Sequence, residues 1–228
     1  MSRRSAPVPE TAAASPAPTV RSARVRDKRG LILDAAVKVF ARGGTHGARV
    51  SDIAREAGVA YGLVYHYFKN KDEILSTLFE EQWSGFLAAV RDIGASDRTL
   101  RERLVSIAAL ILDAHRVRPD WVRVLVFEIQ RSQRFAQPGQ VQAMRRLFDE
   151  MRDILERAQG AGEMRDDTSP AVAATMFIGA LEIVVTSLAL ETAELPQDES
   201  GRRAYYLAFA NETAEIFLNG CARGGSAR

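Results

Sequence analysis

Apolar residues recur every three or four positions along most of the chain, the spacing that places them on one face of an α-helix. Near residue 50 they cover about two helical turns: Val50, Ile53, Ala54, Ala57. Gly58 follows and can leave a helix with positive φ. Val64 and Phe68, four residues apart, then repeat the inward spacing. This pattern predicts two short helices joined by a tight turn within residues 49–71.

Longer segments carry the same helical spacing, and each ends at a glycine, a proline or a polar turn. They span residues 27–42, 72–93, 98–116, 120–134, 140–159, 170–191 and 200–219. Asn70 with Glu73, and Ser169 before Pro170, are residue types that cap the N-terminus of a helix. Because alternating runs of β-branched residues are few, the chain predicts an all-α fold.

The predicted helices divide into an N-terminal and a C-terminal group. Residues 1–26 are rich in Ala, Pro, Ser and Arg and predict a disordered basic tail. Residues 27–71 predict a three-helix helix-turn-helix domain, too small to hide every helix face, so that one helix is free to enter a DNA major groove. Residues 72–220 predict a larger C-terminal helical domain, and residues 221–228 a short tail.

The formal net charge of +2 hides an asymmetry between the two parts of the chain. Residues 21–71 contain eleven Lys and Arg against four Asp and Glu, whereas residues 72–228 contain eighteen against twenty-four. A basic excess is what a phosphate-binding surface requires. Since this excess coincides with the helix-turn-helix pattern, it predicts double-stranded DNA as a partner.

The segment 171–190 is long and apolar enough to cross a bilayer, with Glu182 as its charged residue. A charge near the middle of a membrane span costs about 2.5–3.5 kcal/mol, and no basic cluster flanks the segment. A helix that is apolar all round is otherwise buried on every side. We therefore predict no membrane partner, and a helix with one face on the core and another on a second subunit.

The cysteine, histidine and glycine residues of the chain do not have the spacing of a catalytic, metal-binding or phosphate-binding motif. A single cysteine, Cys221, excludes an internal disulfide and a multi-cysteine metal site, and suits a reducing cytoplasm. The histidines, His46, His66 and His115, lack metal-ligand spacing. The glycines at 43–47 follow a helix and lack a Gly-Lys-Ser/Thr ending. The sequence predicts a cytoplasmic protein that is not an enzyme and holds no cofactor or metal.

The stretches LILDAAVKVFARGG and VSDIAREAGVAYGLVYHYFKNKDEIL resemble the N-terminal domain of the TetR family of bacterial one-component transcriptional regulators. The similarity spans about residues 28–80 and is carried by the motif Ile-Ala-x-x-Ala-Gly-Val with Gly-x-x-Tyr-x-Tyr-Phe-x-x-Lys. It implies an all-helical homodimer that binds a palindromic operator. It also implies an internal ligand pocket in the C-terminal domain and a dimer interface of four helices, the last two from each subunit.

The resemblance implies roles for residues of the second short helix. Ala60, Tyr61 and Leu63 match positions that approach base edges or adjacent phosphates, and Gly62 permits close approach of the backbone. The segment reads Ala-Tyr-Gly where the family commonly has Ser-Lys-Gly. Direct reading of guanine by a lysine is therefore lost, and base readout rests more on Tyr61 and on apolar contacts to thymine methyl groups.

Other positions match residues that bind phosphate in the family. Tyr65 and Tyr67 match its phosphate-contacting aromatic residues, and Lys71 its phosphate-binding lysine at the start of the next helix. The family usually has a threonine at the position of Arg49. We therefore expect Arg49 or Ser51 to make the phosphate contact there.

In the C-terminal half, KNKDEILSTLFEEQWSGF, FEIQRS and LFDEMRDILERAQGAGEM resemble the TetR-type repressors of fatty-acid degradation, whose inducers are long-chain acyl-CoA thioesters. An acyl chain needs an apolar tunnel between helices. The candidate ligand-binding residues are Phe86, Ile107, Ile111, Phe127, Glu128, Arg131, Phe177 and Glu182. Arg131, with Arg123 or Arg134, would meet the CoA phosphates, the alternative for each being a surface ion pair.

The sequence is compatible with three functions. The first is a repressor that leaves its operator when a small hydrophobic ligand shifts the helix of residues 71–93. The second keeps DNA binding but makes the protein an activator or a repressor without a ligand. The third is a ligand-binding or enzymatic helical bundle whose N-terminal third only supports the fold, which predicts no salt-dependent affinity for DNA.

Overall fold

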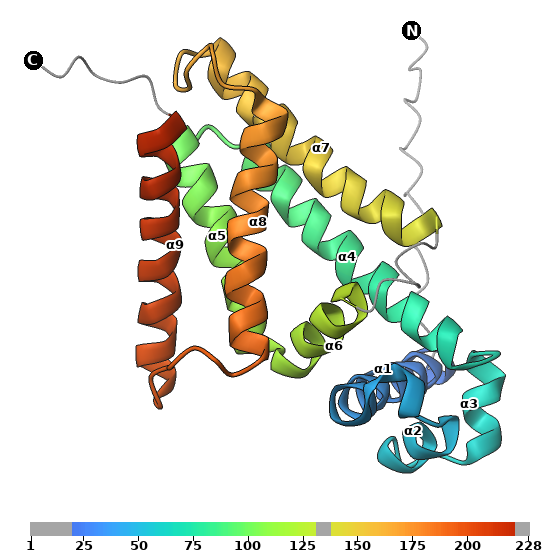
Figure 1. Cartoon of the computed structure of the whole chain (residues 1–228). Helices are drawn as coiled ribbons and strands as arrows, with labels where there is room; N and C mark the ends of the chain where they lie inside the picture. Colours follow the sequence, from blue (N-terminus) through green and yellow to red (C-terminus); the bar gives the residue numbers. More distant parts are fainter. Residues whose placement is uncertain (1–19, 131–137, 222–228) are drawn as a thin grey trace, which may run out of the picture.

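The computed structural model describes residues 20–130 and 138–221, and within these ranges the chain forms helices and no strand (Figure 1). In chain order the helices are α1 (Val20–Gly47), α2 (Val50–Glu56), α3 (Tyr61–Tyr67), α4 (Lys71–Ala95), α5 (Leu100–Val117), α6 (Pro119–Gln130), α7 (Pro138–Gly160), α8 (Pro170–Ala189) and α9 (Glu199–Cys221). The predicted all-α fold is confirmed for this part of the chain. The predicted tails lie mostly outside the described residues, but the prediction of disorder is wrong for residues 20–26, which are helical and belong to α1, and Cys221 ends α9.

Helices α1, α2 and α3 form one end of the molecule around their own apolar core (Figure 1). The inward positions expected from the sequence are buried, including Ile53, Val64 and Phe68. Gly58 has φ 62°, so it makes the left-handed turn that the α2–α3 connection needs. The prediction that the first helix stops at Gly43–Gly44 is confirmed, because the helical backbone breaks at Gly44, where φ is 66° and ψ is 161°, and a separate short turn follows to Gly47.

Helix α4 connects the two ends of the molecule, since its 25 residues span about 37 Å. Its N-terminus is capped as expected by Asn70 Oδ1, which accepts from the Glu73 backbone N–H at 2.8 Å. The Glu73 carboxylate accepts from the Lys69 backbone N–H instead of that of Asn70, so the predicted capping box is only half formed. A complete box starts α5, between Thr99 and Glu102.

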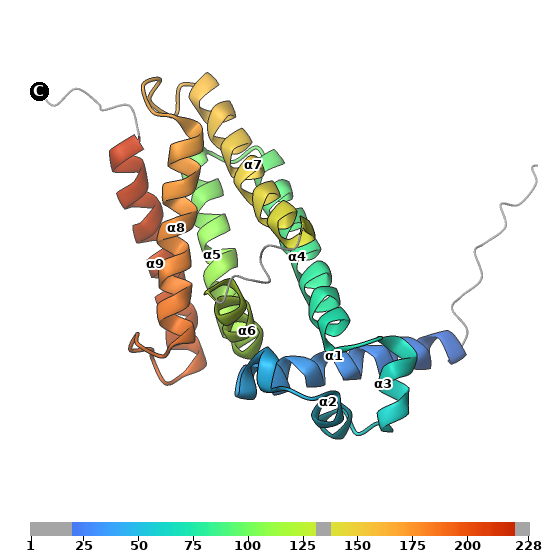
Figure 2. The same cartoon turned by 45° about the vertical axis from the view of Figure 1, so that its right-hand side comes forward.

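The larger end of the molecule is a bundle in which α5, α8 and α9 run side by side and α7 lies along α4 (Figures 1 and 2). A second apolar core fills it, with Leu104, Ile107 and Met151 among its fully buried side chains. Ser169 Oγ caps α8 and Pro170 occupies its first turn, as expected. The predicted division of the chain at residue 71 remains a prediction, because the first core also includes Leu78 and Phe79 from α4.

Helix α6 lies between the two cores and contributes to both. Trp121 and Val124 belong to the first core, where Trp121 packs edge-to-face on Phe79 with ring centroids 5.1 Å apart. Val122 and Val126 belong to the second core. Spacings of three and four residues thus place two apolar stripes on opposite sides of one short helix.

Among the described helices, α8 alone is long and apolar enough to cross a membrane, with a mean hydropathy of 1.9. One face of α8 is buried in the second core, including Phe177, Leu181 and Val185. The other face exposes Met176 and Ile183, each 67% exposed. Core helices of soluble proteins have the same length and composition, so α8 by itself does not indicate a membrane protein.

Candidate nucleic-acid interface and ligand cavity

Helix α3 presents Tyr61 and Tyr65 to solvent, while Val64 and Phe68 fix the helix to the core. The two tyrosines are 54% and 44% exposed, and their hydroxyl oxygens lie 3.1 Å apart. Their rings meet edge-to-face with centroids 5.1 Å apart. The hydrogen bond with Tyr61 raises the pKa of Tyr65 above its ordinary value.

Three further residues of this segment differ in accessibility. Gly62 is exposed, and a Cβ there would have no neighbouring atom within 4 Å, so the backbone is open to close approach. Ala60 is exposed before the first turn of α3. Leu63 and Tyr67 are only half-buried, and Tyr67 packs on the His66 ring. Their predicted DNA contacts would involve the outer parts of these side chains.

The start of α2 lies beside α3 and carries the two alternatives for a phosphate contact (Figure 1). Arg49 and Ser51 are both exposed, and Arg49 has extended backbone angles immediately before the first helical residue. Within the described ranges, Arg49 makes no ion pair with an acidic side chain. Both side chains are therefore accessible for the predicted role.

The structure gives Lys71 a role that the sequence did not indicate. Its Nζ donates to the backbone carbonyls of Thr45, His46 and Ala48, at 2.9, 3.0 and 3.3 Å. These carbonyls follow the kink of α1 and lie where a helix end leaves acceptors without intrahelical partners. Because an ammonium has three donors, the predicted phosphate contact of Lys71, which remains a prediction, would compete with these bonds.

Other charged residues of this domain are paired. Arg42 and Lys38 both contact Glu56, and Arg55 contacts Asp52 at 2.7 Å. The Arg42 guanidinium lowers the pKa of the Glu56 carboxyl. A depression of about 530 Å³ between α1 and α2 is lined by Arg42, Asp52, Arg55 and Glu56 among others, and these paired charges do not suit an apolar ligand.

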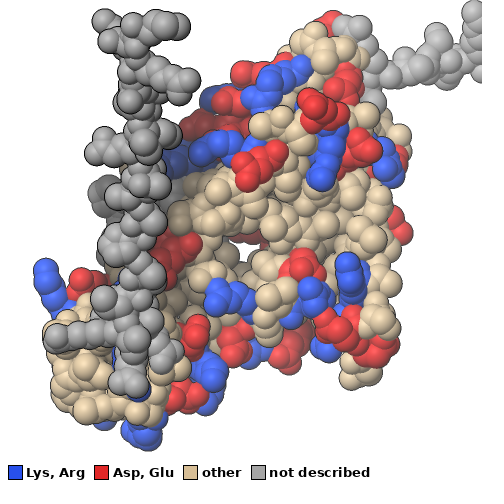
Figure 3. All heavy atoms as spheres, turned by 180° about the vertical axis from the view of Figure 1, so that it is seen from behind, with Lys and Arg blue, Asp and Glu red and all other residues tan. Residues whose placement is uncertain are grey.

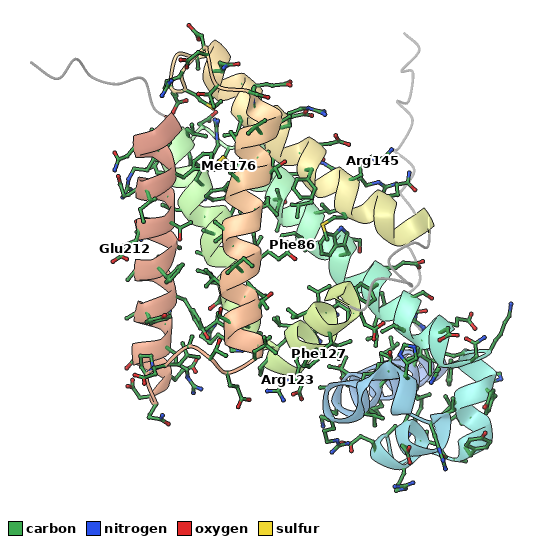
Figure 4. The ribbon with its side chains drawn as sticks, in the orientation of Figure 1. Phe86, Arg123, Phe127, Arg145, Met176 and Glu212 are labelled. Atoms are coloured by element: carbon green, nitrogen blue, oxygen red, sulfur yellow. The ribbon has the colours of Figure 1, made fainter. Side chains whose placement is uncertain are left out.

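The larger bundle is open between α4 and α8, above α6. Seen from behind, an opening passes through a surface made largely of uncharged residues (Figure 3). Phe86 lies on α4 at this level, and Phe127 lies on α6 below it (Figure 4). Phe86, Ile111 and Phe127 are half-buried, as predicted lining residues of an apolar tunnel would be.

Trp83, one turn before Phe86, is a candidate for this cavity that sequence reasoning missed. The two rings lie 5.4 Å apart. The indole Nε1 of Trp83 is buried and has no hydrogen-bond partner among the described residues. A buried donor without a partner costs free energy, which a ligand acceptor would recover. The available signal was the spacing of Trp83, which falls within the apolar stripe of a long helix between Phe79 and Phe86.

The other predicted ligand residues are dispersed. Ile107 and Phe177 are buried in the second core, at 0% and 1% exposure, and Phe177 packs on Phe217. Glu182 is exposed on α8. Arg131 and Arg134 lie outside the described residues, and Arg123 forms a surface ion pair with Glu191.

Glu128 does not face the cavity. Its carboxylate accepts a hydrogen bond from Thr45 Oγ1 on α1 at 2.5 Å, and the side chain is directed toward the N-terminal domain. The prediction that Glu128 contributes to ligand binding is therefore corrected. The reason is geometric, because Glu128 falls on the same side of α6 as Trp121 and Val124.

His115 lies at the lower end of the bundle, where its Nδ1 is 2.8 Å from the hydroxyl of Tyr206 on α9. Burial lowers the pKa of His115, with a further contribution from the neighbouring charges of Arg123 and Arg202. Burial also raises the pKa of Tyr206. This pair joins α5 to α9, as expected of a core or pocket-edge histidine.

Comparisons with known proteins agree with this geometry. Residues 32–78 match the bacterial regulatory proteins of the tetR family, and residues 101–190 match the tetracyclin repressor-like C-terminal domain. The chain is 28% identical to the fatty acid metabolism regulator protein of Bacillus subtilis over 199 residues, covering 86% of this chain and 96% of the relative. It is 30% identical to the HTH-type transcriptional repressor NicS of Pseudomonas putida over 156 residues, covering 65% of this chain and 71% of the relative.

One solved structure adds a ligand to the comparison. The transcriptional regulator FadR from Bacillus subtilis, in complex with stearoyl-CoA, superposes with a TM-score of 0.72 and 26% identity. The alignment covers 84% of this chain and 98% of that protein. The relatives named here are regulators or repressors.

Proposed function

The chain belongs to the tetR family of bacterial regulatory proteins, and we propose that it is a cytoplasmic homodimeric repressor that leaves its operator when a long-chain acyl-CoA binds. In this proposal residues 27–71 form the DNA-binding domain, and residues 72–220 bind the ligand and the second subunit. The observation that carries the DNA-binding part is the exposed tyrosine pair on a helix that Val64 and Phe68 fix to the core.

The proposed DNA contacts follow from the accessibility of the residues. Tyr61 and the open backbone at Gly62 approach the bases in the major groove, with Ala60 and the outer part of Leu63 beside them. Phosphate contacts come from Arg49 or Ser51 at the start of α2, and from Tyr65 and Tyr67 on α3. Lys71 stabilises this surface indirectly, because its Nζ donates to the backbone carbonyls of Thr45 and His46 at the end of α1.

The proposed subunit interface is the outer face of α8 and α9. These helices form one side of the bundle, and Met176 on α8 lies on this side (Figure 4). Val172, Met176 and Ile183 are large apolar residues that are exposed and follow one stripe of α8, at spacings of four and seven residues. Helix α9 also exposes Leu207 and Ile216. Exposed apolar residues that line one helix face mark a protein–protein contact.

The proposed ligand is supported by the opening beside Phe86 and by the stearoyl-CoA complex of the related regulator. An acyl chain matches a channel lined by Phe86, Ile111 and Phe127. The unpartnered Trp83 Nε1 offers a donor for a carbonyl oxygen of the ligand. Arg131, which lies outside the described residues, and Glu182, exposed on α8, belong to the same proposal as candidate ligand-binding residues.

The test uses the full-length protein and DNA from its own upstream region, measured by fluorescence anisotropy at several salt concentrations. We expect salt-dependent binding that is tighter than binding to a scrambled fragment by a factor of about 10³ or more. Stearoyl-CoA should release the DNA, whereas free CoA and stearate serve as controls. Equal affinity for both fragments would contradict the repressor function. Specific binding that stearoyl-CoA leaves unchanged would contradict only the acyl-CoA ligand.

A further inference from the structure

Thr45 and Glu128 form a buried polar contact between the DNA-binding end and the larger bundle. They are 2% and 4% exposed, and they are the buried polar or charged residues in the described ranges. Thr45 Oγ1 donates to Glu128 Oε1 at 2.5 Å. A carboxylate buried without a partner is strongly unfavourable, so this contact favours one arrangement of α1 against α6 over shifted ones.

Glu128 extends the face of α6 that packs on the first core. Trp121, Val124 and Glu128 are separated by three and four residues and lie on this face, whereas Val122 and Val126 lie on the opposite face. The opposite face packs in the bundle that contains the opening. A displacement of α6 from the bundle side would therefore act on the Thr45–Glu128 contact.

Thr45 is bound on its other side to the start of α4. Its backbone carbonyl accepts from Lys71 Nζ at 2.9 Å, while its side chain bonds to Glu128. The left-handed kink at Gly44, immediately before Thr45, turns this residue out of the line of α1. One residue thus connects α1 with both helices that run between the two ends of the molecule.

We propose that Thr45 and Glu128 are positioning residues that set the orientation of the DNA-binding domain on the bundle. The regulatory meaning of this inference rests on the proposed function: a ligand that moves α6 would alter the contact and with it the spacing of the two recognition helices in the dimer. Neither residue touches DNA or ligand in this assignment.

The variants are chosen so that folding and positioning can be separated. Thr45→Val or Glu128→Leu alone leaves a buried polar group without a partner, which destabilises the protein. The double variant Thr45→Val/Glu128→Leu removes both groups and should fold. Thr45→Ser keeps the hydroxyl and should behave as the wild type. Asp34→Asn is the matched control, because it breaks an exposed ion pair with Arg118 near the same α1–α6 boundary.

The first measurement needs neither DNA nor ligand. Spin labels are attached at two exposed positions away from the proposed subunit interface, through Ser51→Cys on α2 and Arg145→Cys on α7, in a Cys221→Ser background diluted with unlabelled protein. We expect the distribution of label distances to broaden or shift in the double variant, and to stay as in the wild type for Thr45→Ser and Asp34→Asn. An unchanged distribution in the folded double variant would overturn the inference.

The second measurement concerns half-site spacing. The preference is the ratio of the affinity for the upstream fragment with its native half-site spacing to the affinity for the same fragment lengthened by one base pair between the half-sites. We expect this ratio to be about threefold to tenfold smaller for the double variant than for the wild type. A purely structural role would lower the melting temperature and leave the preference unchanged. If the wild type bound no DNA, the proposed function would fail, and the distance measurement would still decide the inference.

Discussion

The hydroxyl groups of Tyr61 and Tyr65 lie 3.1 Å apart on the exposed side of α3. Four residues separate them, so they are neighbours on consecutive turns of α3. Either hydroxyl can donate the hydrogen bond between them. The oxygen atoms can also accept a hydrogen bond from a group outside the pair. The two residues nevertheless differ in their expected roles, because Tyr61 lies in the first turn and Tyr65 further along the helix.

This difference can be tested on DNA. We expect Tyr65→Phe to weaken binding to all sequences, by about 0.5–1.5 kcal/mol, because it removes a hydrogen bond to phosphate. Tyr61→Ala should change which operator variants are preferred, since it removes a side chain that approaches bases. Affinities for a panel of single-base operator variants measure both effects. An equal loss on every sequence for Tyr61→Ala would refute its assigned role.

Lys71→Met should destabilise the protein by about 1–3 kcal/mol, even without DNA. The substitution keeps the aliphatic chain but removes the three hydrogen bonds to the end of α1. Urea unfolding monitored by circular dichroism measures the change. Lys69→Met is the control, because Lys69 is exposed two residues earlier. If both variants lost DNA affinity and neither lost stability, phosphate binding would account better for Lys71.

Ile183→Glu should convert the protein to a monomer. Ile183 is 67% exposed on α8, and a carboxylate there would be desolvated in the proposed subunit interface. Light scattering coupled to size exclusion gives the mass directly. Ala88→Glu, on an exposed position of α4, is the control and should remain a dimer. A dimeric Ile183→Glu variant would place the interface elsewhere on the surface.

The stability of the wild type should fall as the pH is lowered below about 6.5. Burial lowers the pKa of His115 in the folded protein. Between this lowered pKa and the ordinary pKa of histidine, the unfolded chain therefore binds more protons than the folded protein. The free energy of unfolding is therefore unaffected by His115 above the ordinary pKa of histidine, and it falls as the pH drops from that pKa toward the lowered pKa of the folded protein. Melting temperatures at pH 7.5 and 5.5 should differ less for His115→Gln than for the wild type. A matched substitution, His46→Gln, tests an exposed histidine in the same assay.

Periodicity alone predicted most of the architecture. Helices form wherever apolar residues recur at three- and four-residue spacing, and their ends follow local chemistry at Gly58, Asn70 and Ser169. The outward direction of Tyr61 and Tyr65 follows from the same spacing, because Val64 and Phe68 must face the core. Such features depend on residues close together in the chain and are therefore accessible from the sequence.

Contacts between distant segments were decided only by the tertiary structure. Lys71 and Thr45 are 26 residues apart, and Thr45 and Glu128 are 83 apart, so no local pattern indicated that they meet. The sequence determined that Glu128 is a carboxylate within an apolar helix, but not which core its side of α6 would face. That choice depends on how α6 packs between α1 and the bundle, and it made Glu128 a partner of Thr45 instead of a ligand residue.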